Sequence, residues 1–391
     1  MLPELSILPG YHKRFLQGYP WLYANELSKS YLTKDLEPGA LVTLTHHQQP
    51  IATGYFNRHS LISFRVLTRL PHEIIDTAFF VKRLEKALAL RKQFYTQPFY
   101  RLIHAEADGL PGLIVDRFED VLVVQINTQG MQKLVDFLLE ALHHLFSPST
   151  IYLKNDSPVR ELENLPILEP VIIGKALSSL HVIENGTQFL IDIAAGQKTG
   201  WFFDHRENRQ MISELAEGKS VIDYFCYSGG FSLQAAKSAR KVIGVDASNA
   251  ALRNAARSAT LNQLSEKCQF VCKDAFKDMD ERIEKNQCFD IVILDPPAFV
   301  KSKKDLMPGL KGYEKLIYKA SKLVTENGFL MIASCSYHVK EADLKNCLIR
   351  ALHKSQRSGK IVKTIFAGPD HPPHPILEES NYLKGFLVFL E

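Results

Sequence analysis

The feature that most constrains the fold is an alternation of short apolar runs with segments of helical periodicity, from about residue 195 onward. Near-continuous apolar strands that alternate with helices are typical of a parallel sheet covered by helices on both faces. The predicted strands are SVIDYF (220–225), KVIGVD (241–246), QFVCKD (269–274), FDIVILD (289–295) and GFLMIAS (328–334). This rhythm predicts a Rossmann-like α/β domain over residues 191–391.

The predicted strands share a second property, because each ends at or beside a side chain capable of chemistry. These side chains are Asp223, Asp246, Asp274, Asp295 and Cys335. Ligands of open parallel sheets bind beyond the carboxyl ends of the strands. We therefore expect a site at that edge, with helix capping as the alternative role of each aspartate.

The turn DYFCYSGGF (223–231) indicates which cofactor the sheet binds. Gly229 and Gly230 allow positive φ and close approach of the backbone to a ligand. A dinucleotide-binding fold favours GxGxxG, and an acid before the glycines would repel a diphosphate. S-adenosylmethionine carries a sulfonium, an ammonium and no phosphate, so it suits Asp223. Asp246 would then accept the ribose hydroxyls, and Asp274 a hydrogen bond from the adenine amino group.

The DPPAF segment (295–299) and the lysines after it indicate where a substrate would lie. Paired prolines fix the backbone and leave no amide donors, which makes a rigid surface for a planar base. Lys301, Lys303 and Lys304 would then bind RNA phosphates. The alternative is that this charge run is simply a solvated face.

Cys335 has two interpretations, since free cysteine usually behaves as a small buried hydrophobe. Carbon 5 of cytosine is a poor nucleophile, and a thiolate that adds to carbon 6 makes it able to accept a methyl group. Such a thiolate needs a lowered pKa and a nearby acid–base group. His338 is a candidate for that group, although a histidine after a strand is more often an ordinary surface residue.

The N-terminal half and the composition indicate further domains. Runs rich in β-branched and aromatic residues at 40–46, 50–56 and 62–68 predict a small β-barrel within residues 1–75, and residues 76–190 read as a central α+β domain. Net charge is only +4. No apolar stretch is long enough to cross a bilayer. Six cysteines, all in the second half, predict a reducing cytoplasmic location without disulfides or a metal site.

Taken together, the motifs resemble a known family. GQKTGWFFDHRENR (196–209), DYFCYSGGFS, ILDPPAF and SCSYH resemble the class I methyltransferases that make 5-methylcytosine in large-subunit (23S) ribosomal RNA. The segments 18–27 and 54–67 look like that family's PUA domain, an RNA-binding β-barrel. The resemblance implies that Cys335 is the nucleophile and that Asp295 lies beside the target base and the cofactor. The cofactor residues that it implies are Lys198, Thr199, Phe203, Asp204, Arg206, Asp223, Tyr227, Gly229, Gly230, Asp246 and Asp274.

Two positions depart from the family pattern. Ser228 stands where threonine is usual, and Ala298 stands where other cytosine-5 methyltransferases carry a second cysteine. The alternatives are methylation of another RNA base such as guanine, or an RNA-binding assembly factor without catalysis. The expected partner is ribosomal RNA, with no membrane; a homodimer is compatible with the sequence.

Overall fold

The computed structural model describes residues 2–28, 35–193 and 199–391, and the chain forms two compact units. The first comprises Met1–Ser178, Gln197–Trp201 and Pro369–Ser380, and the second comprises Ser179–Gly196, Phe202–Gly368 and Asn381–Glu391. The boundaries expected at residues 75 and 190 stay predictions. Each unit contains three separate segments of the chain, whereas the predicted domains were continuous stretches of sequence.

The N-terminal part of the first unit is a five-stranded sheet in the order β1-β3-β4-β5-β2. Its elements are β1 (Glu4–Ser6), α1 (His12–Leu16), β2 (Trp21–Leu22), η1 (Ala24–Glu26), β3 (Ala40–His46), β4 (Gln49–Phe56) and β5 (Phe64–Thr68). The runs predicted at 40–46, 50–56 and 62–68 are confirmed as β3, β4 and β5. Their apolar side chains enclose a small core around Phe15 and Phe64, both fully buried.

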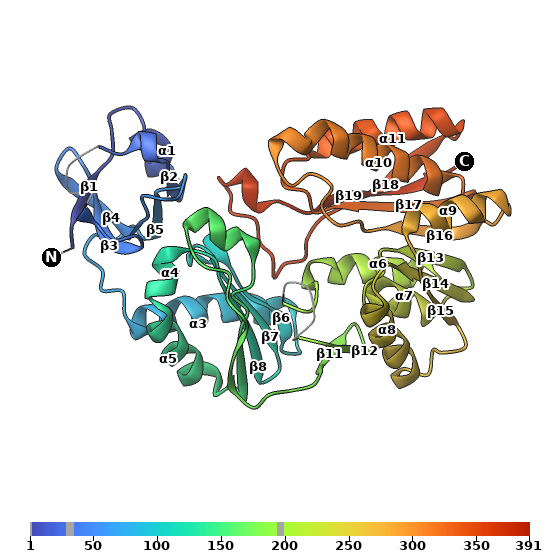
Figure 1. The fold of residues 1–391 in the computed structure, drawn as a ribbon, viewed down its shortest axis with the longest axis horizontal. Coiled ribbons are helices and arrows are strands. Elements are labelled where there is room, and N and C mark those ends of the chain that lie inside the picture. Colours follow the sequence, from blue (N-terminus) through green and yellow to red (C-terminus); the bar gives the residue numbers. More distant parts are fainter. Residues whose placement is uncertain (1, 29–34, 194–198) are drawn as a thin grey trace. The chain divides into compact units, whose positions relative to one another are not determined.

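The rest of the first unit is a second five-stranded sheet with helices, in the order β10-β9-β8-β7-β6 (Figure 1). Its elements are α3 (Thr77–Phe94), β6 (Phe99–His104), η2 (Ala105–Asp108), β7 (Leu113–Phe118), β8 (Val121–Ile126), α4 (Gln129–Lys133), α5 (Val135–Phe146), β9 (Thr150–Leu153), η3 (Pro158–Glu163) and β10 (Val171–Gly174). Within this sheet β7 and β8 pair antiparallel and form a hairpin around Glu119 and Asp120. Asp76 caps the N-terminus of α3, where its carboxylate accepts the Phe79 N–H at 3.0 Å.

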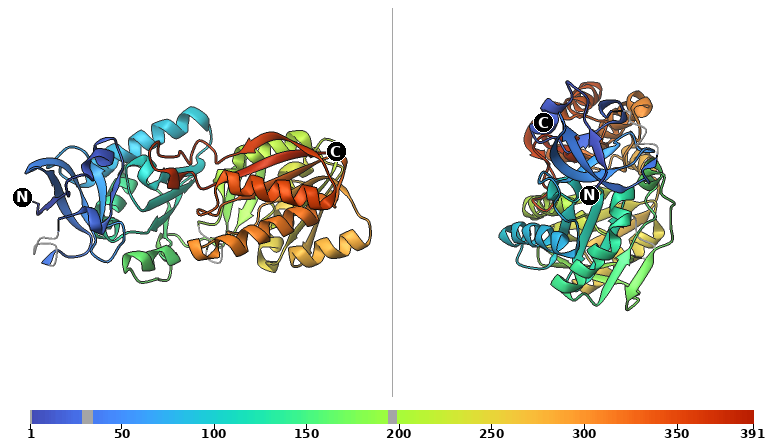
Figure 2. Two further views of the ribbon diagram at one scale, coloured as in Figure 1. Left: turned by 90° about the horizontal axis from the view of Figure 1, so that it is seen from above. Right: turned by 90° about the vertical axis from the view of Figure 1, so that its left-hand side faces the viewer.

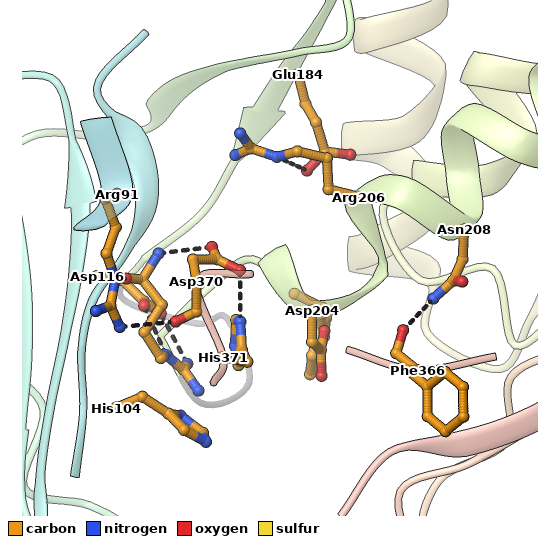
Figure 3. A network of polar contacts seen from close by, with 12 residues as sticks. Arg91, His104, Asp116, Glu184, Asp204, Arg206, Asn208, Phe366, Asp370 and His371 are labelled. Carbon is orange, nitrogen blue, oxygen red and sulfur yellow. Dashed lines mark hydrogen bonds and ion pairs between the residues drawn. The ribbon is translucent and has the colours of Figure 1, made fainter. Parts of the chain in front are cut away.

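A buried ionic network fastens the segment Pro369–Ser380 to this part of the first unit (Figure 3). Arg91, fully buried, donates to both carboxylate oxygens of Asp108 at 2.6 and 2.7 Å and to the Asp370 carbonyl at 2.9 Å. The Asp370 carboxylate accepts the backbone N–H of Arg101 at 2.9 Å and lies 2.8 Å from Nδ1 of His371. The segment around Asp370 is therefore held by hydrogen bonds to Arg91 and Arg101, which are far from it in the sequence.

The second unit is built around a seven-stranded sheet in the order β15-β14-β13-β16-β17-β19-β18 (Figures 1 and 2). The strands are β13 (Ser220–Tyr224), β14 (Lys241–Asp246), β15 (Cys268–Cys272), β16 (Phe289–Leu294), β17 (Val324–Ser334), β18 (Gly359–Ile365) and β19 (Lys384–Leu390). The first five are parallel, as predicted. The strands β18 and β19, which pair antiparallel at the end of the sheet, were not predicted from the sequence.

Helices cover both faces of this sheet. They are η4 (Phe203–His205), α6 (Arg206–Leu215), α7 (Gly230–Ala236), α8 (Asn249–Leu261), α9 (Ala275–Glu284), η5 (Lys303–Asp305), α10 (Leu306–Ser321) and α11 (Glu341–Ser355), and a hairpin of β11 (Leu180–Glu184) and β12 (Thr187–Ile191) packs beside α8. One apolar core joins Ile222 and Tyr224 to α9, α10 and α11, and another joins Val221 to α6 and α7. Successive strand residues therefore face opposite layers of helices. Asp223 is two residues after Val221, so its side chain lies on the same face of the sheet, toward α7.

No helix in the described ranges is both long and apolar enough to cross a bilayer.

We predict that Arg91→Met lowers the free energy of unfolding by about 3–5 kcal/mol, because it leaves the Asp108 carboxylate buried without its partner. Urea denaturation measures the change. Lys92→Met, at an exposed position on the same helix, is the matched control and should change stability by less than about 0.5 kcal/mol. Equal losses for the two variants would contradict the proposed anchoring role.

Candidate functional site

The sheet order brings the predicted strand-end residues to one edge. The parallel strands β14, β13, β16 and β17 are neighbours in that order, so Asp246, Asp223, Asp295 and Cys335 follow one another along their carboxyl ends. Asp223 is one residue inside its strand, whereas Asp295 and Cys335 are the first residues after theirs. The expectation that these side chains share one edge is confirmed.

Asp223 is a buried carboxylate with only one of its oxygens satisfied. Its Oδ2 accepts hydrogen bonds from the backbone N–H and the hydroxyl of Ser232 at 3.0 and 2.6 Å. Its Oδ1 is buried and has no partner among the described residues. Burial raises the pKa of Asp223 to about 7; the Ser232 hydrogen bonds oppose this rise, and the nearby Asp295 carboxylate adds to it. A cationic ligand would satisfy the open oxygen, and the ammonium of S-adenosylmethionine fits that requirement.

The glycine turn is held in a left-handed backbone conformation. Tyr227 has φ of 50° and Gly229 has φ of 80°, immediately before α7. A Cβ atom at Gly230 would lie 2.7 Å from Nε of Arg209. The Tyr227 N–H donates to Oδ2 of Asp246 at 2.9 Å, and Oδ1 of Asp246 accepts a bond from the Ser248 N–H at 2.7 Å. The turn thus orients Asp246, whose oxygens each keep a lone pair for a ribose hydroxyl.

Asp274 adopts the capping role that the sequence offered as its alternative. It lies two residues beyond β15, is exposed, and accepts the N–H of Lys277 at 3.0 Å as the N-cap of α9. Its contact with an adenine stays a prediction.

The residues expected from the 196–209 segment divide among several environments. Lys198 lies outside the described residues, and Thr199 is buried in the first unit, where its hydroxyl donates to the Trp201 carbonyl at 3.5 Å. Phe203 is fully buried, and Asp204 accepts a hydrogen bond from the Tyr382 hydroxyl at 2.6 Å. Their roles as cofactor contacts stay predictions.

Glu184 on β11 is a buried centre of charge that the sequence analysis missed. It is 1% exposed, and it accepts hydrogen bonds from Arg209 and Gln234, both at 2.8 Å. Arg206, one of the predicted cofactor residues, lies 3.7 Å from its other oxygen (Figure 3). This carboxylate connects the hairpin to α6 and to α7, the helix that follows the glycine turn. No local sequence pattern marks such a residue.

His205 was also missed, and it contacts Asp295 directly. Its Nε2 lies 3.3 Å from Oδ1 of Asp295, and its Nδ1 lies 3.1 Å from the side-chain amide of Asn208. Burial by itself would lower the pKa of His205, but the charge and hydrogen bond of Asp295 and the charge of Asp204 together outweigh burial, so the pKa is raised. His205 is next to Asp204 in the sequence, but what marks it as functional is its proximity to Asp295. That proximity exists only in the folded chain.

Cys335 lies at the tip of β17, half-buried, between two fully buried serines. The Ser334 hydroxyl donates to the Tyr313 hydroxyl at 2.8 Å, and Ser336 Oγ lies 3.0 Å from the same oxygen. The turn around the thiol is therefore fixed from both sides. The ring of His338 packs edge-on against Tyr337, with ring centroids 4.7 Å apart.

The lysines predicted to bind RNA follow Asp295 closely in the chain. Lys301, Lys303 and Lys304 are exposed, and none forms an ion pair within the described ranges. Ser302 and Asp305 fix this turn, because the Ser302 N–H and hydroxyl donate to the Asp305 carboxylate at 3.1 and 2.6 Å. Three unpaired cations therefore project from an ordered segment, and their contact with RNA stays a prediction.

A cavity of about 470 Å³ lies within the first unit. Its wall includes Arg69 and Arg83, but these side chains already donate to backbone carbonyls of Phe15, Tyr19 and Leu67. It contains none of the strand-end residues, so we do not place the chemistry there. In the part of the chain that the structure describes, no cluster of His, Cys, Asp or Glu forms a candidate metal site.

The raised pKa of Asp223 predicts a pH-dependent stability. Below pH about 4 the carboxyl is protonated in both folded and unfolded chains; between about 4 and 7 only the unfolded chain ionises, so stability falls as pH rises. We predict that Asp223→Asn stabilises the ligand-free protein by about 1–4 kcal/mol at pH 8 and by much less at pH 5. Denaturation at the two pH values measures this, and a variant less stable than wild type at pH 8 would contradict it.

Comparisons with known proteins agree with this geometry. A family model described as S-adenosylmethionine-dependent methyltransferase matches residues 168–372, and a PUA-like model matches residues 5–69. The fold of a protein assigned as a methyltransferase and crystallised with SAH has a TM-score of 0.85 at 20% identity, covering 99% of this chain and 100% of that chain. The predicted class I methyltransferase fold with an N-terminal PUA-like domain is therefore confirmed.

Curated relatives extend over the whole length. Ribosomal RNA large subunit methyltransferase I of Aeromonas hydrophila is 34% identical and covers 99% of both chains, and that of Photobacterium profundum is 32% identical and covers 100% of both. The cofactor expected from the sequence is confirmed as S-adenosylmethionine. The chain belongs to the ribosomal RNA large subunit methyltransferase I family and is an S-adenosylmethionine-dependent methyltransferase.

Proposed function

We propose that this enzyme methylates carbon 5 of a cytosine in large-subunit ribosomal RNA through a covalent adduct at Cys335. The observation that carries the proposal is the position of the half-buried Cys335 at the tip of β17, next along the sheet edge to Asp295. A methyltransferase that acts on a more nucleophilic base atom needs no thiol at this position. The RNA class follows from the relatives, whose names state that they act on ribosomal RNA.

The role of the thiolate follows from the electronic structure of cytosine. The sulfur of Cys335 would bond to carbon 6, and the electron pair of the 5,6 double bond would then be available at carbon 5. When bound, S-adenosylmethionine supplies an electrophilic methyl group on a sulfonium. Carbon 5 would bond to that methyl group as the bond between the methyl and the sulfonium breaks, and a neutral thioether leaves. Loss of the carbon 5 proton to solvent and cleavage of the bond between the Cys335 sulfur and carbon 6 would then restore the double bond and return the thiolate.

The row of carboxylates would attract the cationic cofactor to the same edge. Asp223 offers an unpartnered, buried oxygen, and Asp246 offers an oriented carboxylate. Asp295 lies between Asp223 and Cys335 in the strand order, so we place it beside both cofactor and base. His205 would hold the Asp295 carboxylate in one orientation through their 3.3 Å contact.

RNA would be bound by the PUA-like domain in residues 1–75 and by the three exposed lysines after the DPP turn. Carbon 5 of a base in a stacked duplex is inaccessible to this edge, so the target cytosine must be unpaired or flipped out. Pro296 is buried and Pro297 is exposed, which leaves a rigid surface without backbone donors for a planar base.

We predict that Cys335→Ala lowers methyl transfer to ribosomal RNA by at least about a thousandfold, because the covalent route is lost. Affinity for S-adenosylmethionine, measured by calorimetry, should change less than about twofold, since the thiol does not hold the cofactor. Cys272→Ala, at an exposed cysteine at the end of β15, is the matched control and should retain full activity.

The product distinguishes this proposal from its alternatives. Mass spectrometry of nucleosides from RNA treated with the enzyme should give 5-methylcytidine. A methylated guanosine, together with full activity of Cys335→Ala, would refute the cytosine proposal. RNA binding without any methyl transfer from labelled cofactor would indicate an assembly factor.

We further predict that the association constant for S-adenosylmethionine rises about tenfold per pH unit below pH 7 and levels off above it, until the cofactor's own ammonium loses its proton near pH about 8. The reason is that Asp223, with a pKa of about 7 in the ligand-free site, must lose its proton to pair with the cationic cofactor. Calorimetry between pH 5.5 and 8.5 tests this. Asp223→Asn should bind weakly with a flat profile, and an unchanged slope in that variant would exclude Asp223 as the titrating group.

A further inference from the structure

Lys384 is a buried lysine beside the Cys335 turn that the proposed chemistry has not yet used. It is 6% exposed, and it begins β19, where it pairs with Ser334, the last residue of β17. Its ammonium donates to the carbonyl oxygens of Ser336 at 3.0 Å and Val339 at 2.6 Å. Both carbonyls belong to the turn that begins at Cys335, so the cation lies directly under the turn that carries the thiol.

The burial of this charge is not compensated by a carboxylate. Within the described ranges no Asp or Glu oxygen lies within 4.0 Å of Nζ of Lys384, whereas other buried cations such as Arg91 and Arg209 have such a partner. Burial lowers the pKa of Lys384, and the charges that oppose this are those of Cys335 first and Asp343 second. A buried ammonium held only by carbonyls is costly, and an anionic sulfur would repay that cost.

Other ionisable groups also lie around the turn. Tyr313 on α10 has both neighbouring serines bound to its hydroxyl, and burial raises its pKa, so it stays neutral. Asp295 at the end of β16 is negative and would oppose a thiolate. His338 and Lys340 are on the turn itself; His338 is half-buried, and Lys340 is exposed, so solvent screens its ammonium.

We propose that Lys384 is a positioning residue whose buried ammonium stabilises the thiolate of Cys335 and fixes the turn that presents it. The thiol proton leaves to solvent, and no oxidant or other reactant is required. This inference rests on the proposed function in one respect: Cys335 is useful as a thiolate only if it is the nucleophile. The ionisation itself is a separate property and is measured separately.

The test is the pH profile of alkylation of Cys335 by iodoacetamide in the full-length protein, followed by peptide mass spectrometry. Tryptic cleavage gives the peptide 323–340, in which Cys335 is the sole cysteine, and the peptide 286–301, in which Cys288 is the sole cysteine. Cys288 is exposed and distant along the sequence, so it serves as an internal reference in every sample. We expect Cys335 in the wild-type protein to be alkylated with a pKa at least one unit below that of Cys288.

In Lys384→Met the profile of Cys335 should move up by at least one unit, so alkylation at pH 7 falls about tenfold while Cys288 is unchanged. Lys384→Arg keeps the charge and should stay close to the wild-type profile. A purely structural role predicts loss of methyl transfer in Lys384→Met with the Cys335 profile unmoved, and that outcome overturns the inference. Melting temperature and cofactor binding of both variants show whether the fold is intact.

The wild-type protein alone also decides the question if Lys384→Met does not fold. A wild-type Cys335 that titrates at or above Cys288 overturns the inference without any variant. Full methyl transfer by Cys335→Ala would instead refute the proposed function, and it would leave the alkylation result standing. The two ideas therefore fail by different experiments.

Discussion

The site depends on one constraint, which is the parallel pairing of β14, β13, β16 and β17. Parallel strands end at the same edge of a sheet, so residues that are far apart in the sequence are brought side by side without any loop having to carry them there. Hydrophobic layers on both faces stabilise the ladder. The same burial makes ionisation of the Asp223 carboxyl costly in free energy. Only one of its two oxygens has a hydrogen-bond partner among the described residues.

The edge carries opposing electrostatic demands. Carboxylates at Asp223, Asp246 and Asp295 suit a cofactor that bears two positive charges, but the same field disfavours a thiolate beside them. The buried ammonium of Lys384 lies on the Cys335 side of the edge, away from the carboxylate end of the strand order. Because the carboxylates and the ammonium lie at different positions along the sheet, cation binding and thiol ionisation would be able to occur at the same edge.

Within each unit, a cluster of buried polar side chains joins elements that are far apart in the sequence. In the second unit Glu184 joins the β11–β12 hairpin to α6 and α7, so the helix after the glycine turn is fixed from outside the sheet. In the first unit Arg91 and Asp370 hold a segment that arrives from the far end of the chain. Each cluster stabilises the fold only when all its members are present, because removing one member leaves a buried charge unpaired and strongly destabilises the protein.

The sequence by itself determined the five parallel strands, the row of strand-end residues and the cofactor. Apolar periodicity and strand ends are local properties of the sequence, and ligands of parallel sheets bind beyond the carboxyl ends of the strands, so these properties were enough to locate the site. It could not determine the contact of His205 with Asp295, the Glu184 cluster, the antiparallel strands β18 and β19, or the place of Lys384 beneath the Cys335 turn. Each of these depends on partners that no local pattern connects; the bond from Lys384 to Ser336, for example, spans 48 residues. Only the packed fold, by excluding water from such pairs, decides which charges must meet.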